Sequence, residues 1–262
     1  VPNIDPGVGS DYSDSIALAN IYDTLVFPNH DGTTGPLLAK DWEASDDGLV
    51  WTFNLRDDVK FHNGDELTAE DVVFSVERML ALGEGYSYLF TDVLKEVKAL
   101  DTYQVQFTLE KPFGPFLSTL VRMCVLNKDQ VMENIQDGPY GDMGDYGKEW
   151  LITNDAGSGP YMVEELKKQE YLRGVKFEDY WGGWDEDAPE AFEILGTTSP
   201  STIRTLMTRK ELEITDQWQT KEALAALNDL PGVEINGAFT GTILNIMFNT
   251  KKAPTDDIHF RR

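Results

Sequence analysis

Strand patterns and helix patterns follow one another along this chain without a regular period, and this limits its fold more than any other feature. Apolar residues recur at helical spacing over residues 13–26, 72–80, 113–126, 201–210 and 221–228. Alternating or short apolar runs predict strands over residues 50–55, 97–99, 105–109, 161–165, 171–177, 192–195, 212–215 and 242–249. A regular βα repeat would build a parallel sheet, so the irregular order predicts an α/β fold with mixed sheets.

Two local signals are specific enough to place single elements. In the strand at 50–55, Trp51, Phe53 and Leu55 lie on one face, which is therefore strongly apolar. Thr68 followed by Asp71 is a capping box, and it predicts the start of the helix that carries the apolar stripe at 72–80. We assign both features to the folding of the chain and not to the binding of a ligand.

Length and charge limit the architecture and the partners. The chain has 262 residues, which is comfortable for two domains. Its 46 Asp and Glu against 22 Lys and Arg give a formal net charge of −24. Such a surface repels phosphate backbones and anionic membranes, so we expect no nucleic-acid partner. The apolar stretches are too short to span a bilayer.

The residues that carry chemistry form no catalytic constellation. The single cysteine, Cys124, excludes an internal disulfide and is best interpreted as a small buried hydrophobe. The three histidines lack the spacing of a zinc or di-iron site. Ser158 stands in Gly-Ser-Gly and not in a nucleophile elbow, and the Asp142 and Asp145 loop lacks EF-hand spacing. We therefore expect no catalytic residue, no metal and no cofactor.

The two ends of the sequence look trimmed. The chain begins at Val1 without an initiator methionine or an apolar leader, and it ends at Arg262 without a helix cap. We expect a fragment whose targeting segment lies outside this sequence.

A series of phrases in a fixed order carries a resemblance to a known family. They are IDP at residues 4–6, IYDTLV at 21–26, LAKDW at 38–42, SDDGLVWTFNLR at 45–56, VKFHNG at 59–64, LTAEDV at 67–72, FSVERM at 74–79, GSGPY at 157–161, YWGG at 180–183 and FNT at 248–250. Together they resemble the family 5 extracellular solute-binding proteins, the dipeptide and oligopeptide receptors of ABC importers. Two departures are Ser158, where the family has threonine, and Lys210, which replaces the glycine of a Gly-Glu-Ile-Asp phrase.

The resemblance implies a periplasmic-binding-protein-like fold (type II, cluster C). It assigns residues 1–22 and 155–250 to a base lobe and residues 23–154 to an inserted extra domain. Residues 251–262 would begin the crossing to a second ligand-gripping lobe, which this chain lacks. The turn-rich segment Gly157-Ser158-Gly159-Pro160 would be the return crossing between the extra domain and the base lobe.

The resemblance also implies where a ligand binds. Three stretches correspond to cleft-facing segments of the family, and the ligand-binding residues that we expect are Ser10, Tyr12, Tyr86, Tyr88, Asp216, Gln217 and Trp218. Ordinary surface or packing between domains is the competing interpretation for each of them. An extended peptide held as an added strand is gripped mainly through its backbone.

Several functions remain open at this point. The resemblance implies a monomeric, non-enzymatic receptor that delivers a di- or oligopeptide to a permease at the outer face of the cytoplasmic membrane, free in the periplasm or lipid-anchored. The same family includes receptors for oligosaccharides, nickel complexes and other small solutes. An oligosaccharide would need more aromatic platforms in the cleft, and a metal complex would need a histidine or arginine there. A secreted carboxylate hydrolase is the remote alternative from another class.

Overall fold

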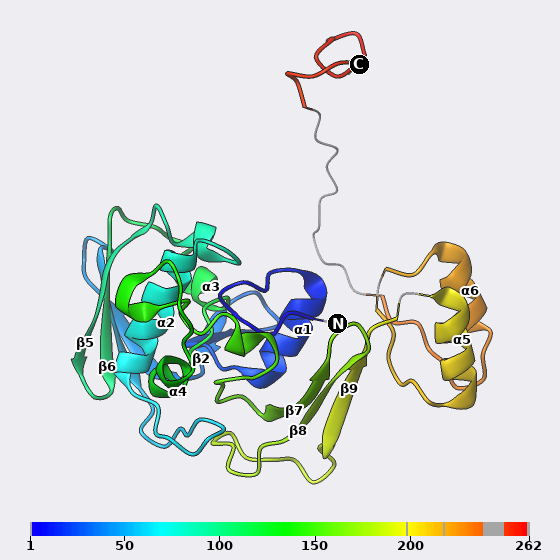
Figure 1. Ribbon diagram of the computed structural model, residues 1–262, viewed down its shortest axis with the longest axis horizontal. Helices are drawn as coiled ribbons and strands as arrows, with labels where there is room; N and C mark the ends of the chain where they lie inside the picture. The colour runs from blue at the N-terminus through cyan, green and yellow to red at the C-terminus, as the bar shows by residue number, and fades with distance from the viewer. Residues whose placement is uncertain (1, 198, 217, 238–248, 261–262) are drawn as a thin grey trace. The chain divides into compact units, whose positions relative to one another are not determined.

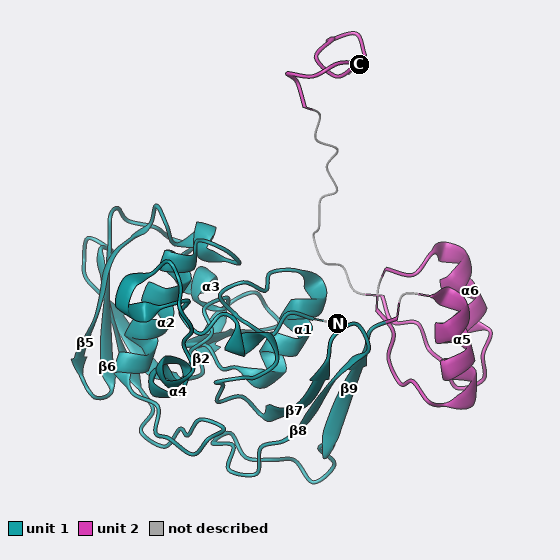
Figure 2. Cartoon of the chain, viewed as in Figure 1, with its two compact units in different colours: residues 1–196 teal, residues 197–262 magenta. Residues whose placement is uncertain are grey.

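The computed structural model describes residues 2–197, 199–216, 218–237 and 249–260, and it divides the chain into two compact units. Unit 1 comprises Val1–Gly196 and unit 2 comprises Thr197–Arg262 (Figure 2).

A four-stranded sheet with the order β3-β4-β6-β5 forms one part of unit 1 (Figure 1). Its strands are β3 (Ala39–Ala44), β4 (Val50–Leu55), β5 (Leu94–Asp101) and β6 (Gln104–Leu109). The β4 strand and the β5–β6 hairpin confirm the sequence prediction. Phe53 and Leu55 are fully buried and Trp51 packs against the same core, as the alternating pattern indicates.

The helix α2 (Ala69–Leu82) packs on this sheet and begins at the predicted capping box. The Asp71 carboxylate accepts the backbone N–H and the hydroxyl of Thr68, both at 2.9 Å. Its other oxygen accepts the backbone N–H of Lys128 at 2.9 Å, so Asp71 also holds the start of α4 (Lys128–Glu133). The helix ends at Gly83, whose φ of 65° is the left-handed conformation that glycine accepts without strain.

Two predicted helices are shorter than expected. The first, α1 (Tyr12–Ile21), is capped by Asp11, but Tyr22 is extended and the chain continues into β1 (Val26–Pro28). The expected helix at 113–126 is reduced to α3 (Phe116–Leu120). Both are cut short because Thr24 and Cys124 form a β-bridge, which requires extended backbone on both sides.

A second, three-stranded sheet consists of β7 (Tyr161–Lys167), β8 (Tyr171–Lys176) and β9 (Ala191–Leu195). A two-stranded sheet pairs β1 with β2 (Thr34–Pro36). Short 3-10 helices span Ser87–Leu89, Gly141–Met143 and Trp150–Ile152. All strand pairs within the described residues are antiparallel, which corrects the expectation of mixed sheets for this part of the chain. Most of these strands are joined by short turns, and a short turn permits only an antiparallel pair.

Unit 2 contains the helices α5 (Pro200–Arg209) and α6 (Lys221–Asn228), which confirm the predicted positions. The expected strand at 212–215 does not form in the structure. A strand needs a neighbour that pairs with its N–H and C=O groups, and the described residues offer this segment none. Most of the strand expected at 242–249 lies outside the described residues.

The buried apolar residues of unit 1 form two clusters. The larger runs from Leu25 to Val125, within the residues predicted for the extra domain. The smaller joins residues 4–22 to parts of α2, to residues 126–156 and to Leu172 of β8. The boundaries at 22/23 and 154/155 stay a prediction. Within the described residues, no helix combines the length and the apolar character that crossing a membrane requires.

We predict that Thr68→Ala lowers the free energy of unfolding by about 1 kcal/mol, because the helix start loses its hydroxyl contact with Asp71. Urea unfolding followed by far-UV circular dichroism measures this change. Thr68→Ser is the matched control, since it keeps the hydroxyl, and we expect it to stay close to the wild type. Equal losses in the two variants would contradict the assignment.

Candidate functional site

A buried ion pair fixes the loop at residues 5–11. The two terminal guanidinium nitrogens of Arg78, Nη1 and Nη2, donate to the two carboxylate oxygens of Asp5 at 2.7 Å, and the side chains are 0% and 2% exposed. Arg78 Nε also donates to the carbonyl oxygen of Tyr146 at 2.8 Å. Asp5 Oδ1 accepts the backbone N–H of Gly7 at 2.8 Å. The helix α2 therefore anchors the loop that carries Ser10 and leads into α1.

Two glycines allow this loop to lie close to the end of α2. A Cβ on Gly7 would lie 2.5 Å from Nη1 of Arg78. Gly85 has a φ of +55°, and a Cβ there would lie 2.9 Å from the carbonyl oxygen of Gly7. Larger residues would push the loop away from the segment that carries Tyr86.

Tyr86 links this loop to the rest of unit 1. Its hydroxyl donates to the carbonyl oxygen of Ser10 at 2.9 Å and lies 3.1 Å from Oγ of Ser15 in α1. The Arg122 guanidinium lies over the Tyr86 ring, 5.1 Å from its centroid, and donates to Ser15 Oγ at 3.3 Å. The ring of Tyr88 lies 6.4 Å from that of Tyr86.

We call this group the tyrosine patch, and it consists of Ser10, Tyr12, Ser15, Tyr86, Tyr88 and Arg122. Tyr88 is 68% exposed and Tyr12, in the first turn of α1, is 44% exposed. The structure thus joins Ser10, Tyr86 and Tyr88 through hydrogen bonds and a ring contact, and it places Tyr12 three residues before Ser15 on the same helix, where positions three apart are neighbours. Whether the tyrosine patch binds a ligand stays a proposal.

Sequence reasoning missed Arg122 and Ser15. Arg122 is the one charged residue in the apolar run at 120–126, and this contrast was the available signal. In the part of the chain that the structure describes, Arg122 is exposed and belongs to no ion pair, although acidic residues outnumber basic ones two to one. The Tyr86 ring and the Ser15 hydroxyl hold its guanidinium in place, and the other N–H groups of the guanidinium can donate to an anion.

The other expected site residues belong to unit 2. Asp216 accepts the backbone N–H of Trp218 at 2.8 Å and the side-chain amide of Gln219 at 3.3 Å. Trp218 is 67% exposed. Gln217 lies outside the described residues. The contacts of Asp216 are those of a local turn.

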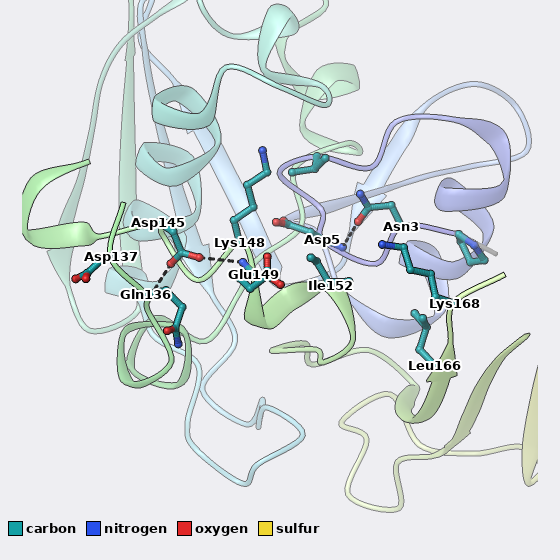
Figure 3. A pocket seen from close by; sticks show the side chains of 12 residues that line it. Asn3, Asp5, Gln136, Asp137, Asp145, Lys148, Glu149, Ile152, Leu166 and Lys168 are labelled. Carbon is teal, nitrogen blue, oxygen red and sulfur yellow. Dashed lines mark hydrogen bonds between the residues drawn. The ribbon is translucent and has the colours of Figure 1, made fainter. Parts of the chain in front are cut away.

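Unit 1 also has a cavity of about 620 Å³ between the N-terminal loop, residues 136–152 and the end of β7 (Figure 3). Its polar side chains are largely engaged in holding the loops. Asp145 accepts three backbone N–H groups, from Gln136, Gly147 and Glu149. Lys148 donates to Glu84 at 2.6 Å. No residue of the tyrosine patch lines this cavity.

The candidate nucleophiles are in unsuitable surroundings. Ser158 is fully buried and donates to Asp23 Oδ2 at 3.2 Å. Its hydroxyl therefore bonds to a carboxylate and not to a histidine, and a substrate in solution cannot reach it. Burial raises the pKa of the Cys124 thiol to about 12, which keeps it neutral at physiological pH. His62 pairs with Asp155, as the base of a catalytic triad would, but its Nε2 lies 2.9 Å from the carbonyl oxygen of Gly159 and not next to a hydroxyl or a thiol.

Within the described residues, no three His, Cys, Asp or Glu side chains gather where they could hold a metal ion.

Comparison with known proteins decides the family. Residues 33–262 match the model of the bacterial extracellular solute-binding proteins, family 5 middle region. The chain belongs to this family. This confirms the resemblance seen in the sequence, and the α/β class and the periplasmic-binding-protein-like fold are confirmed by the solved structures that it matches.

Three relatives show the range of the family 5 proteins. A probable D,D-dipeptide-binding periplasmic protein of Escherichia coli (strain K12) is 32% identical over 99% of this chain and 49% of its own length. A nickel-binding periplasmic protein of the same organism is 28% identical over 94% of this chain and 45% of its own. An ABC transporter-associated periplasmic binding protein from Helicobacter pylori, solved with the peptide STSA, is 29% identical with a TM-score of 0.73, over 87% and 46% of the two chains. The chain spans about half the length of the curated relatives that it matches.

We predict that Arg78→Ala lowers the free energy of unfolding by about 3–5 kcal/mol, because it leaves the Asp5 carboxylate buried without its cation. Urea unfolding followed by tryptophan fluorescence measures the loss. The control is Arg204→Ala, an exposed arginine of α5, for which we expect a change within about 0.5 kcal/mol. A similar small change in both variants would mean that the Asp5–Arg78 pair does not anchor the loop.

Proposed function

We propose that the whole protein is the solute-binding receptor of an ABC importer and that it captures a di- or oligopeptide outside the cytoplasmic membrane. The tyrosine patch carries this proposal: tyrosine rings and an arginine outside any ion pair of the described residues are held by hydrogen bonds and a ring contact on a family 5 framework. The receptor has no catalytic role, works as a monomer, passes its solute to the permease subunits of the importer and resides in the periplasm or at the outer face of the membrane, where a lipid anchor can retain it.

The tyrosine patch suits a peptide for three reasons. Tyrosine rings offer large, rigid apolar surface together with a hydroxyl, so they tolerate many side chains while they bond to a backbone. Ser10 is exposed, and a serine hydroxyl can both donate to and accept from a peptide backbone. The Arg122 guanidinium matches a carboxylate, which every peptide with a free C-terminus carries. In unit 2, Asp216, Gln217 and Trp218 stay proposed ligand-binding residues.

The names of the relatives support a peptide and keep one alternative open. The Escherichia coli relative is named for D,D-dipeptides and the Helicobacter pylori structure holds a peptide. The nickel-binding relative and a structure with nickel and L-histidine point to metal complexes. Arg122 favours this second candidate too, because a chelator that wraps a metal also presents carboxylates. Both candidates therefore require an anionic solute at Arg122.

We predict that Arg122→Gln weakens the binding of a peptide with a free C-terminus about tenfold, because the carboxylate loses its cation. Isothermal titration calorimetry of the whole protein measures this with paired free-acid and amidated peptides. The amidated peptides should bind the variant and the wild type alike. Equal tenfold losses for both forms would show that Arg122 acts on the fold or on another ligand group.

We also predict that Tyr86→Phe weakens peptide binding several-fold, since its hydroxyl orients both Ser10 and Ser15. Tyr171→Phe is the matched control, because it removes a hydroxyl from β8, outside the tyrosine patch. The same calorimetry serves for both variants. Steady turnover of any peptide in these samples would contradict the receptor function outright.

A further inference from the structure

Two segments of unit 1 that are far apart in the sequence run side by side, and we call them together the crossing: residues 21–24 and 157–160. The backbone N–H of Gly159 donates to the carbonyl oxygen of Ile21 at 2.9 Å. A Cβ on Gly157 would lie 2.1 Å from that oxygen, so only glycine fits there. The backbone N–H of His62 donates to the carbonyl oxygen of Gly157 at 2.9 Å. In the predicted domain division, both passages between the base lobe and the extra domain run through the crossing.

Asp23 lies within the crossing and is 3% exposed. Its carboxylate accepts the indole N–H of Trp181 at 2.9 Å, the hydroxyl of Ser158 at 3.2 Å and the hydroxyl of Tyr180 at 3.5 Å. All three donors are neutral, so the charged form of Asp23 is buried without a bonded cation. Burial raises the pKa of the Asp23 carboxyl to about 6, although these hydrogen bonds act in the opposite direction.

His62 holds the same segment from the other side. Its Nδ1 lies 2.5 Å from Asp155 Oδ1 and its Nε2 lies 2.9 Å from the carbonyl oxygen of Gly159. The side chains of His62 and Asp155 are 6% and 7% exposed. These buried contacts hold the segment around Gly159 next to His62.

The other titratable groups near the crossing keep their charge state around neutral pH. Burial raises the pKa of Tyr22, of Tyr180 and of the Cys124 thiol, so all three stay neutral. The Arg56 guanidinium is always charged, and it stacks on the Trp181 ring, 4.2 Å from the centroid. At the surface, Lys60 pairs with Asp179 at 3.6 Å.

We propose that the contacts of Asp23 and His62 form a clasp on the crossing, which closes when Asp23 binds a proton and loosens when Asp23 releases it. Opening exposes the Asp23 carboxyl to water, where its pKa returns to about 3.9. The closed clasp therefore binds this proton more tightly than the open one, and a fall in pH shifts the balance toward the closed form. His62 contributes its contacts with Asp155 and Gly159 to the closed form.

The clasp controls how firmly the two passages of the crossing are joined. Below a pH of about 6 the passages are held together, and at higher pH they separate more often. This device acts on the framework and is independent of which solute the receptor binds.

Hydrogen exchange of the backbone amides tests the clasp. For wild type, we expect the protection of the Gly159 and His62 amides, corrected for intrinsic rates, to fall about tenfold between pH 5 and pH 7.5. In Asp23→Asn, which keeps the shape and the acceptor oxygen, most of this fall should disappear. The amide of Leu109 in β6, which bonds to Leu49, is the reference for global opening. Equal protection at the two pH values, or an unchanged response in Asp23→Asn, would overturn the proposal.

A second measurement uses the wild type alone. The indole N–H resonance of Trp181 should titrate with a midpoint at a pH of about 6, because its acceptor is the Asp23 carboxylate. The indole of Trp184 is the internal control, since it donates to the carbonyl oxygen of Phe177 at 2.9 Å and should not follow that titration. A Trp181 midpoint near 4, or none between pH 4 and 8, would show that Asp23 is not the proton-binding group.

Discussion

The ion pair between Asp5 and Arg78 is the interaction on which the candidate site depends. Charges buried to this degree lose their hydration, and they are tolerated only with good geometry and further hydrogen bonds. Here two parallel bonds, the Tyr146 carbonyl and the Gly7 N–H supply them. The pair fixes the direction of the loop at 5–11 relative to α2, and only with that direction fixed can the Tyr86 hydroxyl reach the carbonyl of Ser10.

The excess of negative charge gives the arginines particular value in this chain. With 22 basic residues against 46 acidic ones, carboxylates are in excess over the cations that can pair with them. Arg78 is paired in the interior, whereas Arg56 and Arg122 lie over aromatic rings. A ring holds a guanidinium in place without neutralising it, so Arg122 stays available to an anion on a surface that otherwise repels one.

Much of the fold could be predicted from the sequence because its signals are local. The Thr68 and Asp71 box, the alternation around Phe53 and the helix at 221–228 each depend on a few neighbouring residues. Spacing alone could not show where α1 ends, since the apolar residues of β1 continue the helical pattern by chance. The strand expected at 212–215 failed for a different reason, because pairing is not a property of one segment.

The candidate site was harder to predict, and the reason is physical. Tyr86 and Tyr88 were named only through a family resemblance, and Arg122 was missed because its partners Ser15 and Tyr86 are remote in sequence. The same holds for His62 and Asp155, which are 93 residues apart. The sequence phrases that carry the family resemblance lie elsewhere in the chain than the residues of the candidate site. Asp5, Asp23, His62, Arg78, Ser158 and Trp181 all lie in them, and each is engaged in a contact that holds the framework.

The tyrosine patch, in contrast, lies between those phrases. Ser10, Tyr12, Tyr86, Tyr88 and Arg122 belong to none of them, so the residues that make the family recognisable are not those proposed to choose the solute. A framework held by buried ion pairs and glycine contacts admits few substitutions, because a lost partner leaves a charge or a clash in the interior. An exposed patch has no such constraint. One framework can therefore serve receptors named for dipeptides, nickel and heme, and the solute must be determined from the patch itself.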